Sequence, residues 1–209
     1  SAAQPGMVYD YSGFPEHTYH IRYAAPGDPA LAARVRELAA AAGIAVGDDP
    51  ARGFDHGTFS MMQPIRPEAD LPVVSLSLKM GYDPAAHLAL GRALAPLRDE
   101  GVLIVGSGLS YHNLRLFGPA GRAPSQAFDD WLQAAMGAAP AQREAQLLQW
   151  ESAPSARTAH PREEHLIPLM VAVGAAFDEE STCVYHEEGV FGGVTASSFR
   201  LGAVPGASA

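Results

Sequence analysis

Hydrophobic residues recur along the chain at two spacings, which predict alternating strands and helices. The clearest predicted strand is Val102–Val105, a run of four apolar residues of which three are β-branched. Such a run, without polar alternation, is typical of a strand buried on both faces in a parallel or mixed sheet. Gly106 and Gly108 follow directly and allow the backbone to turn tightly or to approach a ligand closely. Further strands are predicted at Ile44–Val46 and Leu71–Leu78, and a late strand pair at Val190–Leu201.

Helical spacing is plainest after Asp28, where Leu31, Val35 and Leu38 fall on one face. Asp28 is predicted to cap this helix, with Pro29 at its first position and an end near Gly43. Further helices are predicted from Asp83 to about Asp99 with a break at Pro96, on both sides of Pro140 between Ser125 and Glu151, and from Glu163 to about Phe177. The alternation predicts a three-layer α/β fold, with a central mixed or mostly parallel sheet flanked by helices.

Length and charge narrow the class of protein. A chain of 209 residues suits one domain, predicted to span residues 1–209. A net charge of −9 and a single lysine argue against nucleic acid or an anionic membrane as partner. No apolar run approaches the about 20 residues of a membrane span. Cys183 is the only cysteine, so no internal disulfide can form and a cytoplasmic location is expected.

The chain has eight histidines but no His-Glu-x-x-His or Cys-x-x-Cys motif, so the ligands of a metal site would have to converge from distant segments. His112 follows the glycine pair, where ligands gather beyond the carboxyl ends of strands in open α/β sheets; a loop histidine bonded to a carbonyl is the alternative. His56 lies in Phe54–Gly57, within a predicted loop over 51–59, and a structural turn capped by Asp55 is its alternative.

His165 is predicted to lie in the first turn of the apolar helix that begins near Glu163. A neutral ligand histidine suits that position, and a solvent-bonded histidine at a helix start is the alternative. Glu163 and Glu164 suit the positive end of the helix dipole and need no further role. His87, within an amphipathic helix, is predicted to be at the surface or half-buried.

Taken in order, these stretches resemble the class III extradiol dioxygenase superfamily (LigB-like), in particular its DODA type, the 4,5-DOPA dioxygenase-like family. The resemblance implies a mononuclear non-haem metal centre, with Fe(II) in active enzymes and often zinc as isolated, that opens a catechol ring with O₂. It spans nearly the whole chain. The matching stretches are Tyr9–Glu16, Tyr23–Pro29, Gly53–Gly57, Pro67–Val74, Leu97–Gly108, Ser110–Leu114, Glu164–Leu169 and Ser197–Gly202.

The resemblance also implies roles for individual residues. It makes His165 and His112 metal ligands, gives His112 a catalytic role as well, and makes His56 a second-sphere acid or base. It places His160 in the substrate pocket. Tyr9 and Tyr111 are expected to flank the aromatic ring of the substrate because they are aromatic themselves, and packing within its loop is the alternative for Tyr9. Three histidines, at positions 56, 112 and 165, are accordingly expected to face a common pocket.

The chain departs from the family pattern in one respect. Two further family ligands belong to a His-Gly-Gly/Ser strand end and a Ser-Ala-His-Trp segment, and neither motif occurs here. We expect both, with a strand of the sheet, in a segment upstream of Ser1. A non-catalytic binding protein of the same fold, or a truncated inactive chain, is the alternative to an active dioxygenase. A zinc hydrolase is a weaker alternative, and homo-oligomerisation is left open.

Overall fold

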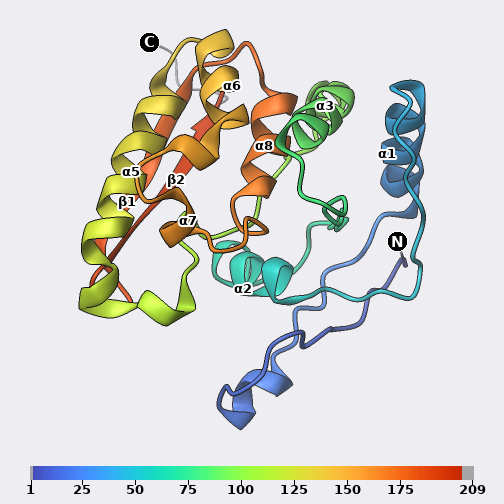
Figure 1. Ribbon diagram of the computed structural model, residues 1–209. Coiled ribbons are helices and arrows are strands. Elements are labelled where there is room, and N and C mark those ends of the chain that lie inside the picture. The colour runs from blue at the N-terminus through green and yellow to red at the C-terminus, as the bar shows by residue number, and fades with distance from the viewer. Residues whose placement is uncertain (1, 204–209) are drawn as a thin grey trace. The chain divides into compact units, whose positions relative to one another are not determined.

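The structure, a computed structural model, describes residues 2–203 (Figure 1). The chain divides into two compact units, Ser1–Ser77 and Leu78–Ala209, each with its own hydrophobic cluster. Within the described residues, no helix combines the length and the apolar character needed to cross a membrane.

The N-terminal unit contains the 3₁₀ helix η1 (Glu16–His20) and the helices α1 (Pro29–Ala41) and α2 (His56–Ile65). The predicted cap of α1 is confirmed, because the Asp28 carboxylate accepts the Leu31 N–H at 2.9 Å. Gly43 adopts a φ of 73° just beyond the end of α1, which ends the helix as predicted. The predicted loop over 51–59 is wrong from His56 onward, because α2 begins there.

An aromatic cluster forms the core of the N-terminal unit. Tyr23, Phe54 and Phe59 are buried, and Tyr9 and Tyr11 pack against them. Met7 and Phe54 form an isolated parallel bridge, in which the Phe54 N–H donates to the Gly6 carbonyl at 2.8 Å and the Val8 N–H donates to the Phe54 carbonyl at 2.7 Å. This bridge runs residues 6–8 alongside the segment that leads into α2.

The C-terminal unit is built mainly from helices packed around one hydrophobic cluster. The predicted helix break at Pro96 and the predicted helix junction at Pro140 are both confirmed. Its elements are α3 (Pro84–Leu94), α4 (Pro96–Asp99), η2 (Leu114–Leu116), η3 (Gly118–Gly121), α5 (Arg122–Gly137), α6 (Pro140–Leu148), η4 (Trp150–Ser152), α7 (Ala156–Ala159), α8 (Ile167–Ala175), β1 (Ser181–Val190) and β2 (Val194–Leu201).

Strands β1 and β2 form an antiparallel hairpin, with Ser181 opposite Leu201 and Val190 opposite Val194. Helix α5 lies along this hairpin (Figure 1). The turn is made by Phe191 and Gly192, whose φ angles are 51° and 84°. The predicted late strand pair is thus confirmed, but the first strand begins at Ser181 and ends at Val190, where the predicted pair begins.

The other predicted strands are wrong. In the described part of the chain, the one sheet consists of β1 and β2, and Ile44–Val46, Leu71–Leu78 and Val102–Val105 are not strands. Leu103 and Val105 are 85% and 48% exposed, so the run is not buried on both faces. A strand needs a neighbour for its backbone hydrogen bonds, and the apolar run alone does not supply one. A mixed helix and strand content is observed; the central parallel sheet is not.

Helices α3 and α8 lie side by side in the C-terminal unit (Figure 1). Two glycines allow this close approach, because a Cβ at Gly91 would meet the backbone of α8 and one at Gly174 would meet the backbone of α3. His87 of α3 is buried, which corrects the prediction that it lies at or near the surface. Its ring accepts the Lys79 N–H at 3.0 Å and donates to the Asp83 carbonyl at 2.7 Å, so both nitrogens are satisfied without solvent.

Candidate metal centre

Two of the predicted site histidines meet in the C-terminal unit. The rings of His112 and His165 stack with centroids 3.5 Å apart and an interplanar angle of 10°. His112 follows the glycine pair at 106 and 108. His165 lies in the turn before α8 and not in its first turn as predicted, because the helix begins at Ile167 rather than near Glu163. Segments more than fifty residues apart in the sequence therefore place two imidazoles together, as was predicted for these two positions.

The glycine pair explains how the two segments come so close. A Cβ at Gly108 would collide with the carbonyl oxygen of His165, and one at Gly106 would lie 2.5 Å from the carbonyl oxygen of Pro168. The next N–H, that of Leu109, donates to Nδ1 of His165 at 3.3 Å. This contact fixes the orientation of the His165 ring relative to the glycine pair.

A second set of backbone contacts holds His112. Its N–H donates to the Ala159 carbonyl at 3.0 Å. The amide of its neighbour Asn113 donates to the Thr158 carbonyl at 2.7 Å. These two hydrogen bonds attach the segment that carries His112 to α7.

His160 and Tyr111 lie in the hydrophobic interior of the C-terminal unit. Nε2 of His160 donates to the Ser110 carbonyl at 2.9 Å, and its ring makes edge contacts with Phe128 and Trp150. The His160 ring is fully buried, and burial lowers its pKa to about 4. The Tyr111 hydroxyl, on an equally buried side chain, donates to the Leu116 carbonyl at 3.3 Å. This environment favours a role for both residues in supporting the site over direct contact with substrate.

Glu164 joins the histidine pair, although its sequence position suggested only a helix-dipole role. Its Oε1 lies 3.7 Å from Nδ1 of His112, and one ligand atom from each of His112, Glu164 and His165 falls within 4.8 Å of the others. The other oxygen, Oε2, is buried without a hydrogen-bond partner and lies 3.6 Å from Nε of Arg162. The sequence did offer one sign of this role, because Glu164 stands next to His165 after a loop. A Glu-His pair after a loop is too common to identify a metal site by itself.

The three side chains fit a transition metal. Two imidazoles and one carboxylate form a donor set that both Zn²⁺ and non-haem Fe(II) accept. The Glu164 carboxylate turns Oε1 toward His112, while Oε2 forms an ion pair with Arg162 but no hydrogen bond, so the group can still accept a further contact. The described part of the chain therefore contains a three-ligand group suited to a metal ion.

The other two predicted site residues, His56 and Tyr9, belong to the N-terminal unit. Nδ1 of His56 is 2.7 Å from Oδ1 of Asp10, and the same oxygen accepts the His56 backbone N–H at 3.2 Å. Partial burial of Asp10 opposes its ionisation, but these hydrogen bonds outweigh burial, so the pKa of Asp10 is lowered. The Tyr9 hydroxyl donates to the Ile21 carbonyl at 2.7 Å. The common pocket expected for His56 with His112 and His165 remains a prediction.

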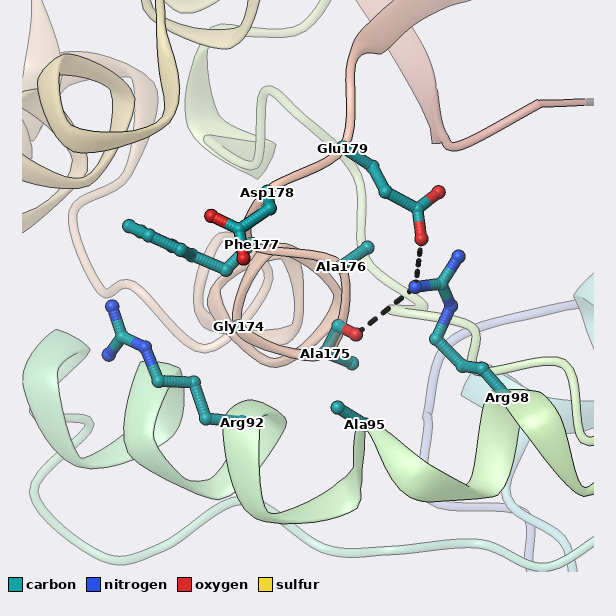
Figure 2. Close-up of a pocket in the computed structure, with 9 residues that line it drawn as sticks. All are labelled: Arg92, Ala95, Arg98, Gly174, Ala175, Ala176, Phe177, Asp178 and Glu179. Carbon is teal, nitrogen blue, oxygen red and sulfur yellow. Dashed lines mark hydrogen bonds and ion pairs between the residues drawn. The ribbon is translucent and has the colours of Figure 1, made fainter.

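A pocket of about 300 Å³ lies at the opposite end of α8 from His165, lined by residues that include Arg92 and Arg98 (Figure 2). Both arginines already have partners. Arg92 pairs with Glu144 and lies over the Phe177 ring. Arg98 pairs with Glu179 and donates to the Ala175 carbonyl (Figure 2). We interpret these contacts as structural links that hold the end of α8.

Comparison with known proteins gives a consistent result. Residues 2–202 match the family model described as the catalytic LigB subunit of aromatic ring-opening dioxygenase. The chain is 40% identical over 203 residues to the dioxygenase tasH of Hapsidospora irregularis, which covers 90% of this chain and 62% of that protein. It is 40% identical over 199 residues to a 4,5-DOPA dioxygenase extradiol of Beta vulgaris, with 93% of this chain and 73% of the relative covered.

Bacterial proteins match as well. A 4,5-DOPA dioxygenase extradiol of Escherichia coli K12 is 33% identical over 202 residues, with 95% of this chain and 74% of the relative covered. The crystal structure of an uncharacterized Escherichia coli K12 protein matches with a TM-score of 0.77 at 30% identity, covering 96% of this chain and 81% of that one. The chain thus spans between 62% and 74% of the length of these three sequence relatives.

Proposed function

The chain belongs to the LigB family of aromatic ring-opening dioxygenases, and on this premise we propose that it carries the catalytic centre of an extradiol dioxygenase acting on a catechol with O₂. The observation that carries this proposal is the group of His112, Glu164 and His165, assembled from two distant segments. The relatives named 4,5-DOPA dioxygenase make a DOPA-like catechol the first substrate to test.

We propose that His112, Glu164 and His165 hold Fe(II), with zinc as the ion that replaces it on isolation. A metal ion held there would supply Lewis-acid and O₂-activating chemistry for a deprotonated catechol. The stacked imidazoles and the buried carboxylate oxygen support this assignment. The further ligand histidines that the resemblance implies would complete the set of three or more fixed ligands that such a site needs.

We assign the proton transfer to His56, on the basis of the Phe54–Gly57 stretch. A catechol coordinates best after losing protons, so a neutral imidazole nearby can accept one and return it later. With its Nδ1–H directed to the Asp10 carboxylate, the neutral His56 ring carries its lone pair on Nε2. Nε2 is therefore the atom that would accept the proton from the catechol hydroxyl.

The remaining assignments are also proposals. Tyr9 is proposed to flank the substrate ring, while His160 and Tyr111 support the site, as their burial favours. A three-layer arrangement within one catalytic domain is proposed from the family match over residues 2–202. Layers on both faces of a sheet would bury the apolar side chains of Leu103 and Val105, which are exposed here. A cytoplasmic location is proposed from the single cysteine.

The test uses the full-length protein, loaded anaerobically with Fe(II) and then mixed with DOPA or caffeate in aerated buffer. Oxygen uptake matched by a yellow ring-opened product is the expected result. The His165→Ala variant should lose both signals, whereas His20→Ala, which changes an exposed histidine on η1, should keep them. A protein that holds stoichiometric iron and consumes no oxygen with any catechol would instead support a binding protein of the same fold.

A further inference from the structure

The N-terminal unit contains an aspartate–histidine pair, Asp10 and His56, that is joined by two hydrogen bonds rather than by one surface contact. One oxygen of Asp10 accepts two hydrogen bonds from the same residue, the ring Nδ1–H of His56 at 2.7 Å and its backbone N–H at 3.2 Å. The two side chains are 35% and 41% exposed, so the pair lies at the surface of its unit, where solvent competes with it. An exposed pair keeps one geometry only if the surrounding chain imposes it.

The surrounding chain does impose it. The parallel bridge between Met7 and Phe54 runs the two segments in register, so that two to three residues further on Asp10 comes beside His56. The tyrosines on either side of Asp10 hold its segment in place through hydrogen bonds to η1 and to Ile21, the residue that follows η1. Tyr9 donates to the Ile21 carbonyl at 2.7 Å and Tyr11 donates to the Thr18 carbonyl at 2.6 Å.

We propose that Asp10 is a positioning residue for proton transfer: it holds the imidazole of His56 in one orientation and in the tautomer with hydrogen on Nδ1 and the lone pair on Nε2. This inference rests on the proposed role of His56 as acid and base. A carboxylate only accepts hydrogen bonds, so the 2.7 Å contact requires the hydrogen to lie on Nδ1.

Two residues near Asp10, Tyr11 and Asp55, bear on how it holds the His56 ring. The Tyr11 ring meets the His56 ring edge-on at 5.9 Å and 90°, which restricts rotation of the imidazole. Among the described residues, the neighbouring carboxylate of Asp55 is paired with Arg52 at 2.8 Å. The contact of Asp10 with the imidazole is the one that we infer sets the tautomer.

The test measures the tautomer directly and turnover separately. Nitrogen-15 NMR of the histidine rings in the full-length protein should show His56 with hydrogen on Nδ1. In Asp10→Asn the amide can donate to Nδ1, so the ring should shift to the Nε2–H form. The kcat for catechol opening should then fall roughly 10- to 100-fold, the usual cost of losing a group that orients a functional histidine, with KM little changed.

Two variants separate positioning from folding. Asp10→Glu keeps a carboxylate and should preserve the Nδ1–H tautomer and recover part of the turnover. Asp55→Asn removes the neighbouring carboxylate and should change neither the tautomer nor kcat. A spectrum of Asp10→Asn with His56 still in the Nδ1–H form would overturn the inference.

The outcome also separates this inference from the proposed function on which it rests. Oxygen uptake that survives His56→Ala would refute the acid-base role of His56, and the catalytic part of this inference with it. Loss of turnover in His56→Ala together with full turnover in Asp10→Asn would leave the proposed function intact and overturn the role of Asp10.

Discussion

The two units of this protein position their functional histidines by opposite means. In the C-terminal unit, His112 and His165 are held by main-chain contacts: two glycines with no room for a Cβ and hydrogen bonds to backbone groups. In the N-terminal unit, His56 begins a helix, and its ring is held by the side chain of Asp10.

The difference teaches which changes each site tolerates. Where backbone packing positions the histidines, their geometry should survive the loss of one polar side chain but not added volume, because packed backbones cannot yield. A site held by an exposed side-chain hydrogen bond has room to accept volume, but its geometry depends on a single carboxylate. The predictions below test this contrast from the largest expected effect to the smallest.

The largest effect is expected from Gly108→Ala. The new Cβ would collide with the carbonyl oxygen of His165 and lie 2.9 Å from its carbonyl carbon, and neither atom can move without shifting the start of α8. We expect the free energy of unfolding to fall by about 3 kcal/mol, the upper part of the usual range for overpacking. Metal affinity should weaken at the same time, since His165 would be displaced.

The matched control is Gly137→Ala at the end of α5, where an added Cβ meets nothing within 4 Å. Alanine is the better helix former, so this variant should be unchanged or more stable by up to about 1 kcal/mol. Urea unfolding of both variants at equal protein concentration makes the comparison. Equal stability of the two variants would show that the contact between the glycine pair and α8 is not a tight one.

The next prediction concerns His160, which burial keeps neutral. Its pKa is lowered from 6.5 to about 4 in the folded protein, so the unfolded chain binds more protons between these pH values. The free energy of unfolding should therefore fall as the pH drops from 6.5 to 4, by roughly 3 kcal/mol from this ring.

The variant His160→Gln, which retains a donor for the Ser110 carbonyl, should lose that part of the pH dependence. The measurement is the difference in unfolding free energy between pH 7 and pH 4, in which effects common to both pH values cancel. His20→Gln, at an exposed position, should keep the wild-type dependence. An unchanged dependence in His160→Gln would show that the ring reaches solvent.

Helices were predictable from sequence to the extent that their signals are local. Asp28 and Pro29 marked the start of α1, and Pro96 and Pro140 marked a break and a junction, because capping and proline geometry act within a few residues. The Val102–Val105 run failed as a strand prediction because strand formation depends on a distant partner, which an apolar run cannot specify.

The candidate site was predictable in its histidines and not in its carboxylate. His112 and His165 were identified by their family motifs, and the glycine pair between Val105 and Leu109 pointed to a close approach. Glu164 was missed because its sequence neighbourhood is that of an ordinary helix start. Asp10 was missed because 46 residues separate it from His56, and the tertiary bridge between Met7 and Phe54 that brings them together has no signal in the sequence.

A smaller effect is expected from Glu164→Gln. The variant keeps the size of the side chain but removes the charge of a buried oxygen that has no hydrogen-bond partner. Affinity for Zn²⁺, measured by competition with a chelator, should weaken by roughly 10- to 100-fold. Glu163→Gln is the matched control, because Glu163 is the adjacent residue and its carboxylate pairs with Arg157. Equal affinity in the two variants would exclude Glu164 from the ligand set.

The smallest effect is expected in the N-terminal unit, from Arg52→Ala. Its ion pair with Asp55 spans 2.8 Å, but the side chains are 47% and 27% exposed, so solvent screens most of the attraction. The free energy of unfolding should change by less than about 1 kcal/mol, and the change should shrink further in added salt. The tautomer of His56 should stay as in the wild type, because Asp10 holds the ring and Asp55 does not. A shift of His56 to the Nε2–H form in Arg52→Ala would show that the charges around the pair, and not the Asp10 hydrogen bond alone, set the ring, and would remove the contrast between the two units.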